Sequence, residues 1–190
     1  GPVINQESIK INYSDNLETL TNKLSQISSK LLVKSIEEIK ATTGTNINKK
    51  LTELLAVRQS ELGNEISYAR QITKDDYLID WASDSTEIYN LVRGLYPNAY
   101  TVYKGKRLKI IEIAITEKKS IDNDTESTNN SRNILHKKKE TGKIIAISKQ
   151  KGIELTTNNN SILIKIGQLE GKKPTDGYTL SVQAKLKTND

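Results

Sequence analysis

The side chains that most often perform acid-base or nucleophilic chemistry are scarce in this chain of 190 residues, which has one histidine and no cysteine. Cys–His catalysis therefore lacks its nucleophile, Ser–His catalysis has a single histidine to serve as its base, and a thiolate metal site is excluded. The histidine, His136, precedes three lysines in a polar stretch, where an imidazole is usually an ordinary solvated side chain. The sequence contains no P-loop, no G-x-S-x-G and no H-E-x-x-H. We therefore assign no catalytic and no metal-binding residue.

Two groups of acidic residues have the spacing of paired carboxylates. Asp75 and Asp76 stand shortly before Asp80, at the start of a more compact pattern. An acid at such a domain entrance usually caps a turn, and we interpret Asp80 in that way. Asp122 and Asp124 lie in a stretch too polar to hold a preorganised metal geometry.

The basic residues offer a different chemistry, which is the binding of phosphate. The net charge is +6 and the pI is about 9.3, and such an excess favours polyanionic partners without requiring them. Four cations surround one predicted turn, with Tyr100 and Tyr103 close by, and two more follow the last predicted strand. Such charges give affinity for phosphates and little readout of base sequence. The candidate RNA-binding residues are Lys104, Lys106, Arg107, Lys109, Lys172 and Lys173.

A small β-domain must position these cations. Asp84 and Glu87 have the spacing of a capping box that opens a short helix, and Pro97 ends it. Two strands are predicted within 99–115 and three more within 142–169, separated by Gly- and Asn-rich turns. A helix followed by five short strands predicts a small closed antiparallel β-barrel of the OB type. A small antiparallel sandwich is the alternative.

The N-terminal part follows a different pattern. Residues 3–11 are predicted to form a strand, and Asp15 with Glu18 is predicted to cap an amphipathic helix that ends near Gly44. A lone strand and helix cannot bury both of their apolar faces. We therefore expect residues 1–44 to be the end of an α/β domain whose sheet lies upstream. A helical extension packed on the C-terminal domain is the alternative.

Two segments separate or interrupt these parts. Residues 45–76 are polar and irregular and are predicted to be an interdomain linker before a domain at 77–190. Residues 118–141 are rich in Asn, Ser, Thr and charge, and such a composition predicts a disordered insertion between two strands. No apolar run approaches the roughly 18 residues that a membrane span needs.

Several motifs together resemble one protein family. YARQITKDDYLIDW (68–81), VRGLYPNAYTVYKGKRLKI (92–110) and GQLEGKKP (167–174) are similar to the linker and C-terminal domain of methionyl-tRNA formyltransferases, especially cyanobacterial or plastid members. GPVINQESIKI (1–11) followed by DNLETLTNKL (15–24) resembles the end of the formyl-transfer domain of that family. The resemblance spans nearly the whole chain except the insertion.

The resemblance implies an α+β fragment with an OB-like C-terminal tRNA-binding domain and a strand-helix remnant of a Rossmann-like formyltransferase domain. The parent enzymes transfer a formyl group from 10-formyltetrahydrofolate to the amino group of methionyl initiator tRNA. The Asn, His and Asp used in catalysis by the family, and its Ser-Leu-Leu-Pro folate loop, have no counterpart in this sequence. The folate site is therefore expected to lie outside the chain, which we expect to be inactive alone.

The same resemblance implies initiator tRNA as the partner, a monomeric protein without metal, and a bacterial cytoplasm or a plastid as its location. Two other function classes stay open at this point. One is the C-terminal part of another folate-dependent formyltransferase, and the other is a stand-alone basic RNA-binding module.

Overall fold

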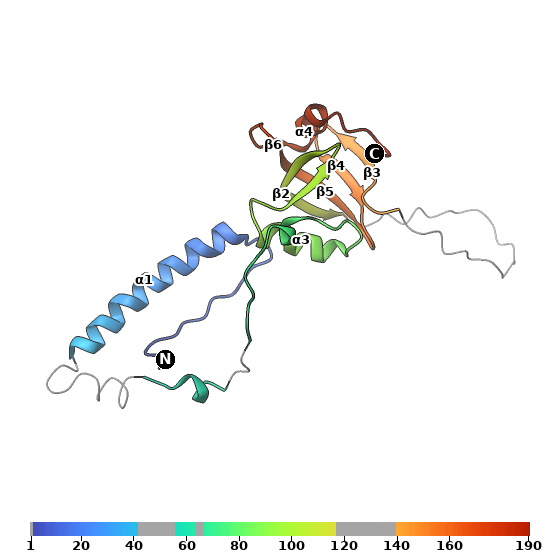
Figure 1. Cartoon of the computed structure of the whole chain (residues 1–190). Coiled ribbons are helices and arrows are strands. Elements are labelled where there is room, and N and C mark those ends of the chain that lie inside the picture. The colour runs from blue at the N-terminus through green and yellow to red at the C-terminus, as the bar shows by residue number, and fades with distance from the viewer. Residues whose placement is uncertain (1, 42–55, 64–66, 117–139) are drawn as a thin grey trace, which may run out of the picture. The chain divides into compact units, whose positions relative to one another are not determined.

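A computed structural model describes residues 2–41, 56–63, 67–116 and 140–190 (Figure 1). The chain divides into two compact units, Gly1–Gln71 and Ile72–Asp190. All buried apolar side chains found among the described residues belong to the second unit, which therefore contains the hydrophobic core.

The first unit has one long helix, α1 (Leu17–Ala41). The Thr19 N–H donates to Asn16 Oδ1 at 2.9 Å, and the Asn16 N–H donates to Thr19 Oγ1 at 3.0 Å. Asn16 therefore caps the helix, and the prediction of a cap by Asp15 and Glu18 is wrong by one residue, because Asn caps a helix as well as Asp does. Although α1 has an amphipathic sequence, none of its residues is buried.

The residues before α1 do not form the predicted strand. Within 3–11, only Val3 pairs, through an isolated antiparallel bridge to Val57 with N–O distances of 2.8 and 2.9 Å. A strand requires a neighbour for its backbone N–H and C=O groups. The described part of the first unit supplies that neighbour at this one position only.

The second unit begins with the predicted helix, α3 (Ser85–Gly94). The capping box is present, and the Asp84 N–H donates to Glu87 Oε2 at 3.4 Å. Ile88 and Val92 are one turn apart on the helix and both are buried in the core.

The second unit also contains an antiparallel sheet, which confirms the α+β class (Figure 1). The hydrogen-bonded order is β1-β2-β5-β4-β3, with β6 paired to β5. The five main strands and the turns between them lie where the sequence predicts, whereas the short β6 and the helix α4 are not predicted. The strands and helix are β1 (Tyr100–Tyr103), β2 (Lys106–Thr116), β3 (Ile144–Ser148), β4 (Gly152–Thr156), β5 (Ser161–Leu169), β6 (Thr175–Asp176) and α4 (Gly177–Ala184).

The sheet is not closed by strand pairing, because the order ends at β1 on one side and β3 on the other. The predicted closed OB-type barrel is therefore not confirmed. Two side chains bridge the seam between these edge strands instead. Trp81 Nε1 donates to Thr101 Oγ1 on β1 at 3.1 Å, and Tyr103 on β1 donates through its hydroxyl to Asp190 Oδ2 at 2.6 Å. The backbone of Asp190 in turn bonds to Ile144 on β3 at 3.1 Å.

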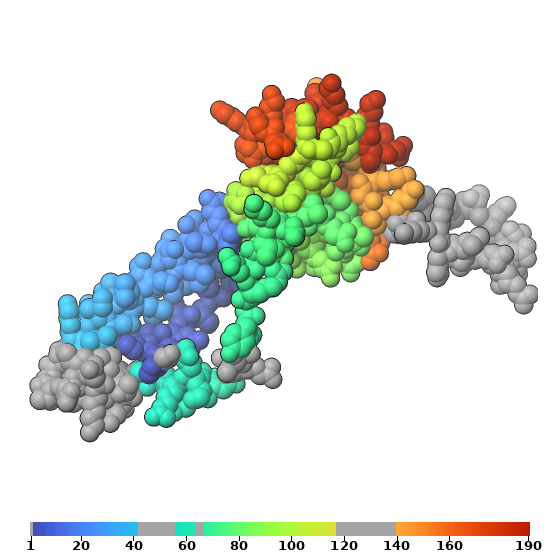
Figure 2. Space-filling model, in the orientation of Figure 1, coloured from blue at the N-terminus to red at the C-terminus, as the bar shows by residue number. Residues whose placement is uncertain are grey.

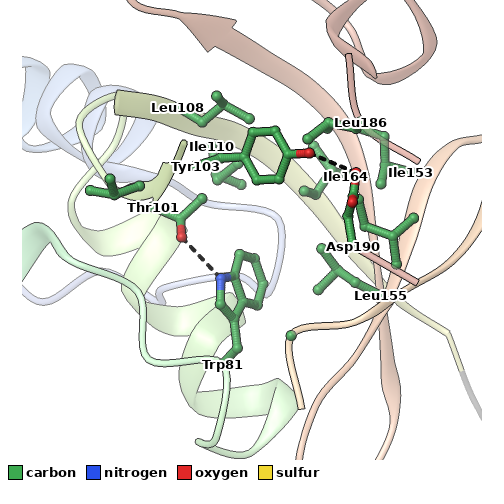
Figure 3. Close-up of a pocket in the computed structure, with 13 residues that line it drawn as sticks. Trp81, Thr101, Tyr103, Leu108, Ile110, Ile153, Leu155, Ile164, Leu186 and Asp190 are labelled. Carbon is green, nitrogen blue, oxygen red and sulfur yellow. Dashed lines mark hydrogen bonds between the residues drawn. The ribbon is translucent and has the colours of Figure 1, made fainter. Parts of the chain in front are cut away.

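A cavity of about 160 Å³ lies at this seam (Figure 3). Its walls are mostly apolar core residues, including Ile110, Ile153 and Ile164, all of which are buried. Figure 3 shows the indole of Trp81 and the phenol of Tyr103 at the cavity. The seam is thus an edge of the core that side-chain hydrogen bonds, rather than strand pairing, hold together around a cavity.

Helix α4 packs unusually closely on β4 and β5. A Cβ atom at Gly177, its first residue, would lie 2.3 Å from the carbonyl oxygen of Ile164, and one at Gly152 would lie 2.2 Å from the same oxygen. Gly152 also has a φ of +111°, which only glycine adopts easily. This close approach allows Leu180 of α4 to reach the core, where it is fully buried.

Some expectations lie outside the described residues. They are the end of the first helix near Gly44, residues 45–55 and 64–66 of the linker, and the insertion at 118–141, apart from Glu140 and Thr141, with His136 within it. No helix in the described part of the chain is long and apolar enough to cross a membrane.

Candidate nucleic-acid interface

The β1–β2 hairpin distributes the predicted cations over two faces. Tyr100 pairs with Lys109, and Val102 pairs with Arg107. Paired residues of an antiparallel ladder point to the same face, as do residues two apart on one strand. These four side chains therefore share the outer face of the hairpin, and Tyr103 with its partner Lys106 lies on the other face.

The outer face forms one wall of a groove of about 280 Å³. The guanidinium of Arg107 lies over the ring of Tyr100, 4.2 Å from its centroid, and Lys109 Nζ donates to Asn98 Oδ1 at 2.9 Å. These contacts fix both cations against the sheet. We call this surface the hairpin groove, and its residues are Lys74, Tyr77, Asn98, Tyr100, Arg107 and Lys109.

Lys74 belongs to the groove but is not among the candidates from the sequence. It directly precedes a short 3-10 helix, η3 (Asp75–Tyr77), and the chain after η3 bridges to β1 through Leu78 and Tyr100. This bridge carries Lys74 and Tyr77 to the hairpin. Figure 2 shows the green chain of this segment beside the yellow-green hairpin. A lysine three residues before a tyrosine is too common a pattern to have revealed the groove.

Lys172 and Lys173 are exposed in the turn after β5. The Gln168 side chain donates to the carbonyl oxygen of Lys172 at 2.6 Å, and Gln168 is the cross-strand partner of Lys109. The turn that carries both lysines is therefore held to the same face of the sheet as the hairpin groove.

Lys104 and Lys106 occupy the tip of the hairpin, away from the groove. Lys104 Nζ lies 4.7 Å from the centroid of the Tyr103 ring, and its contact with Tyr103 raises the pKa of Lys104 above its ordinary value. Tyr103, Lys104 and Lys106 line a different pocket together with Lys185 at the end of α4. The six predicted residues therefore do not form one site. The structure groups Arg107 and Lys109, and separates Lys104 and Lys106 from them.

A further group of lysines was not predicted as a site. Lys149, Lys151 and Lys165 line a cleft of about 340 Å³, in which Lys149 lies 5.8 Å from the ring centroid of Tyr178. We call it the lysine cleft. Lys149 and Lys151 lie in the β3–β4 turn and Lys165 lies on β5. The three lysines are therefore not close enough in the sequence to be recognised there as one group.

The acidic residues near the domain entrance have structural contacts. Asp80 Oδ1 accepts from the Ala82 N–H at 2.9 Å, which confirms that Asp80 caps a turn. Asp76 Oδ2 accepts from the backbone and hydroxyl of Thr73 at 2.6 and 3.0 Å. Across the described ranges, no three His, Cys, Asp or Glu residues are grouped closely enough to hold a metal ion.

The chain was compared with known proteins. The family model described as formyl transferase, C-terminal domain, matches residues 71–182. A methionyl-tRNA formyltransferase of Prochlorococcus marinus (strain NATL2A) is 50% identical over 190 residues, which are 100% of this chain and 56% of that protein. Another, from strain MIT 9515, is 41% identical over 172 residues, covering 90% of this chain and 49% of that protein. The chain thus spans about half the length of these relatives.

Solved structures show the same fold at low sequence identity. HypX from Aquifex aeolicus, as a multiple-alanine variant, aligns with a TM-score of 0.62 at 10% identity, covering 100% of this chain and 29% of that one. HypX in complex with tetrahydrofolic acid aligns with a TM-score of 0.60 at 10% identity, covering 97% and 28%. The family model and the Prochlorococcus relatives confirm the resemblance in sequence motifs. The chain belongs to the formyl transferase family, whose C-terminal domain it carries at residues 71–182.

Proposed function

We propose that this chain is the tRNA-binding part of a methionyl-tRNA formyltransferase. The whole enzyme would transfer a formyl group from 10-formyltetrahydrofolate to the amino group of methionyl initiator tRNA. The curated relatives at 50% and 41% identity have that name, which favours it over another folate-dependent formyltransferase or a stand-alone RNA-binding module. The HypX structures support the fold alone, because their identity is 10%.

The observation that carries the binding role is the hairpin groove. Lys74, Arg107 and Lys109 converge there from two segments of the chain, beside the rings of Tyr77 and Tyr100. Three cations on one face can neutralise neighbouring phosphates of a folded RNA. Folded RNA is recognised largely by shape and backbone, so a basic groove without base-specific pockets suits it.

The proposed organisation assigns residues 1–44 to the end of a formyl-transfer domain, 45–76 to a linker and 77–190 to the tRNA-binding domain, with an insertion at 118–141. The folate would bind to the part of the enzyme that this chain does not supply. We propose a monomer acting where translation starts, in a bacterial cytoplasm or a plastid, and the relatives' source, Prochlorococcus, is consistent with the former.

A graft tests the proposal. The chain replaces the matching region of the Prochlorococcus marinus NATL2A relative, and formylation of methionyl-tRNA is measured with 10-formyltetrahydrofolate. We expect the graft to formylate the tRNA and the 190-residue chain alone to be inactive. A second graft with Lys74, Arg107 and Lys109 changed to Gln should have a higher KM for tRNA and an unchanged KM for the folate. A soluble, folded graft without activity would contradict the proposal.

A further inference from the structure

The tip of the β1–β2 hairpin and the end of α4 enclose a pocket of about 220 Å³, separate from the hairpin groove. Three lysines line it, namely Lys104, Lys106 and Lys185, together with the polar side chains of Tyr103 and Gln183. Figure 2 shows red C-terminal residues beside the yellow-green hairpin. We call this site the tip pocket.

Two of these lysines have left-handed backbone conformations. Lys104 has a φ of 49° and, with Gly105 at 74°, forms a two-residue hairpin turn in which both φ angles are positive, as type I′ requires. Lys185 has a φ of 55° and is the C-cap of α4. Asn or Gly is the favoured residue at both kinds of position. Lysine at both positions therefore has a conformational cost relative to Asn or Gly.

Local contacts explain only in part why lysine occupies these positions. Lys104 lies over the ring of Tyr103, and a cation at a helix C-terminus, such as Lys185, interacts favourably with the last carbonyl groups. Neither contact explains why three like charges from two elements line one pocket, since they repel one another. Within the described part of the chain, none of the three lysines forms a close ion pair, although Lys104 interacts with Tyr103 and, at longer range, with the Asp190 carboxylate, and both raise its pKa.

We propose that the tip pocket binds one phosphate group of RNA, held by Lys104, Lys106 and Lys185. This rests on the proposed function and adds a phosphate site that lies apart from the hairpin groove. A bound phosphate would remove the repulsion between the lysines, and the side-chain amide of Gln183 is available as a neutral donor. Lys185 is thus a recognition residue some 80 positions beyond the hairpin, close in space and distant in sequence.

The left-handed conformation of Lys185 allows a test that keeps the fold, because Asn is well tolerated there. Lys185→Asn and the control Lys187→Asn remove the same charge, and Lys187 does not line the pocket. Binding of folded initiator tRNA to the 190-residue chain is titrated with salt. We expect Lys185→Asn to flatten the slope of log K against log [salt] by about 0.9, the value for one phosphate contact. Lys187→Asn should keep the slope of the unaltered protein. Equal slopes for both variants would overturn the tip pocket and leave the proposed function standing.

A second measurement separates the test of the tip pocket from the test of the proposed function. If the unaltered chain does not bind folded tRNA, the proposed function fails, and the tip pocket is tested with inorganic phosphate alone. Amide NMR signals of Gly105 and Ala184 should then move with phosphate in the unaltered chain and stay fixed in the Lys185→Asn variant. Signals that do not move in the unaltered chain would overturn the phosphate site.

Discussion

Trp81 donates its indole N–H to the hydroxyl of Thr101 at 3.1 Å, and this bond ties the entrance of the second unit to edge strand β1. Trp81 also packs against Gly142, where a Cβ atom would lie 3.3 Å from the Cβ of Trp81. Gly142 lies two residues before Ile144, the first residue of β3. The one tryptophan of the chain therefore spans the seam that strand pairing leaves open.

We predict that Thr101→Val destabilises the second unit by about 1 kcal/mol, because the partly buried indole N–H loses its acceptor. Urea unfolding followed by the fluorescence of Trp81 measures this change. Tyr68→Ala is the control, since Tyr68 is 92% exposed and belongs to the first unit. An unchanged unfolding midpoint in Thr101→Val would show that the bond does not hold the seam.

The other end of the seam should respond to pH. The hydrogen bond from Tyr103 is the largest of the effects that lower the pKa of Asp190 below its ordinary value of 3.8. A carboxyl group with a lower pKa in the folded state stabilises the fold above its unfolded pKa, and this contribution is lost as the pH falls through the folded pKa. We expect Tyr103→Phe to be less stable than the unaltered protein at neutral pH and equally stable well below pH 3.8. A stability difference that stays constant across this range of pH would contradict the assignment.

The close approach of β4 to β5 should make Gly152 irreplaceable, because a Cβ atom there would lie 2.2 Å from the carbonyl oxygen of Ile164. We predict that Gly152→Ala costs clearly more than Gly171→Ala in the free energy of unfolding. Both glycines have positive φ, at +111° and +74°, but a Cβ at Gly171 meets nothing within 4 Å. Gly171→Ala should cost about 1–2 kcal/mol from backbone strain alone. Similar costs for the two variants, measured by thermal unfolding, would mean that β4 and β5 can move apart locally to admit the methyl group.

The contact between Arg107 and Tyr100 should affect affinity without changing the number of phosphates bound. The ring holds the guanidinium at 4.2 Å, and such an exposed cation–π contact contributes about 0.5–1 kcal/mol. We therefore expect Tyr100→Leu to weaken tRNA binding roughly two- to five-fold, with an unchanged salt slope. Tyr68→Leu should change neither quantity. A flatter slope in Tyr100→Leu would mean that Arg107 loses its phosphate when the ring is removed.

Local signals in the sequence predicted most of the second unit. Two examples are the capping box of Asp84 and Glu87 and the turn at Lys104–Gly105. Each depends on residues that are close in the chain, so the local sequence is sufficient to determine the backbone conformation there. Helix α4 escaped prediction because its signal is short and its position depends on the close contact at Gly177.

The arrangement of the site was harder to predict than the elements. The sequence identified the basic hairpin, but the division of its cations between two faces follows from strand register. Lys74 lies in the chain before β1, and Lys185 lies at the end of α4. Tertiary packing alone brings these two lysines to the hairpin. The bond between Tyr103 and Asp190 joins residues 87 positions apart, for which no local pattern exists.

The central claim is that the hairpin groove binds tRNA phosphates, and two triple variants of equal charge test it most directly. One changes Lys74, Arg107 and Lys109 to Gln, and the other changes the lysines of the lysine cleft, Lys149, Lys151 and Lys165, to Gln. Binding of folded initiator tRNA is measured over about 50–200 mM salt, where phosphate contacts dominate the change in affinity. The account predicts that the groove variant flattens the salt slope by about 2–3 units and that the cleft variant retains the slope of the unaltered chain. A groove variant with the full slope, beside a cleft variant that has lost it, would contradict the account and move the binding surface to the lysine cleft.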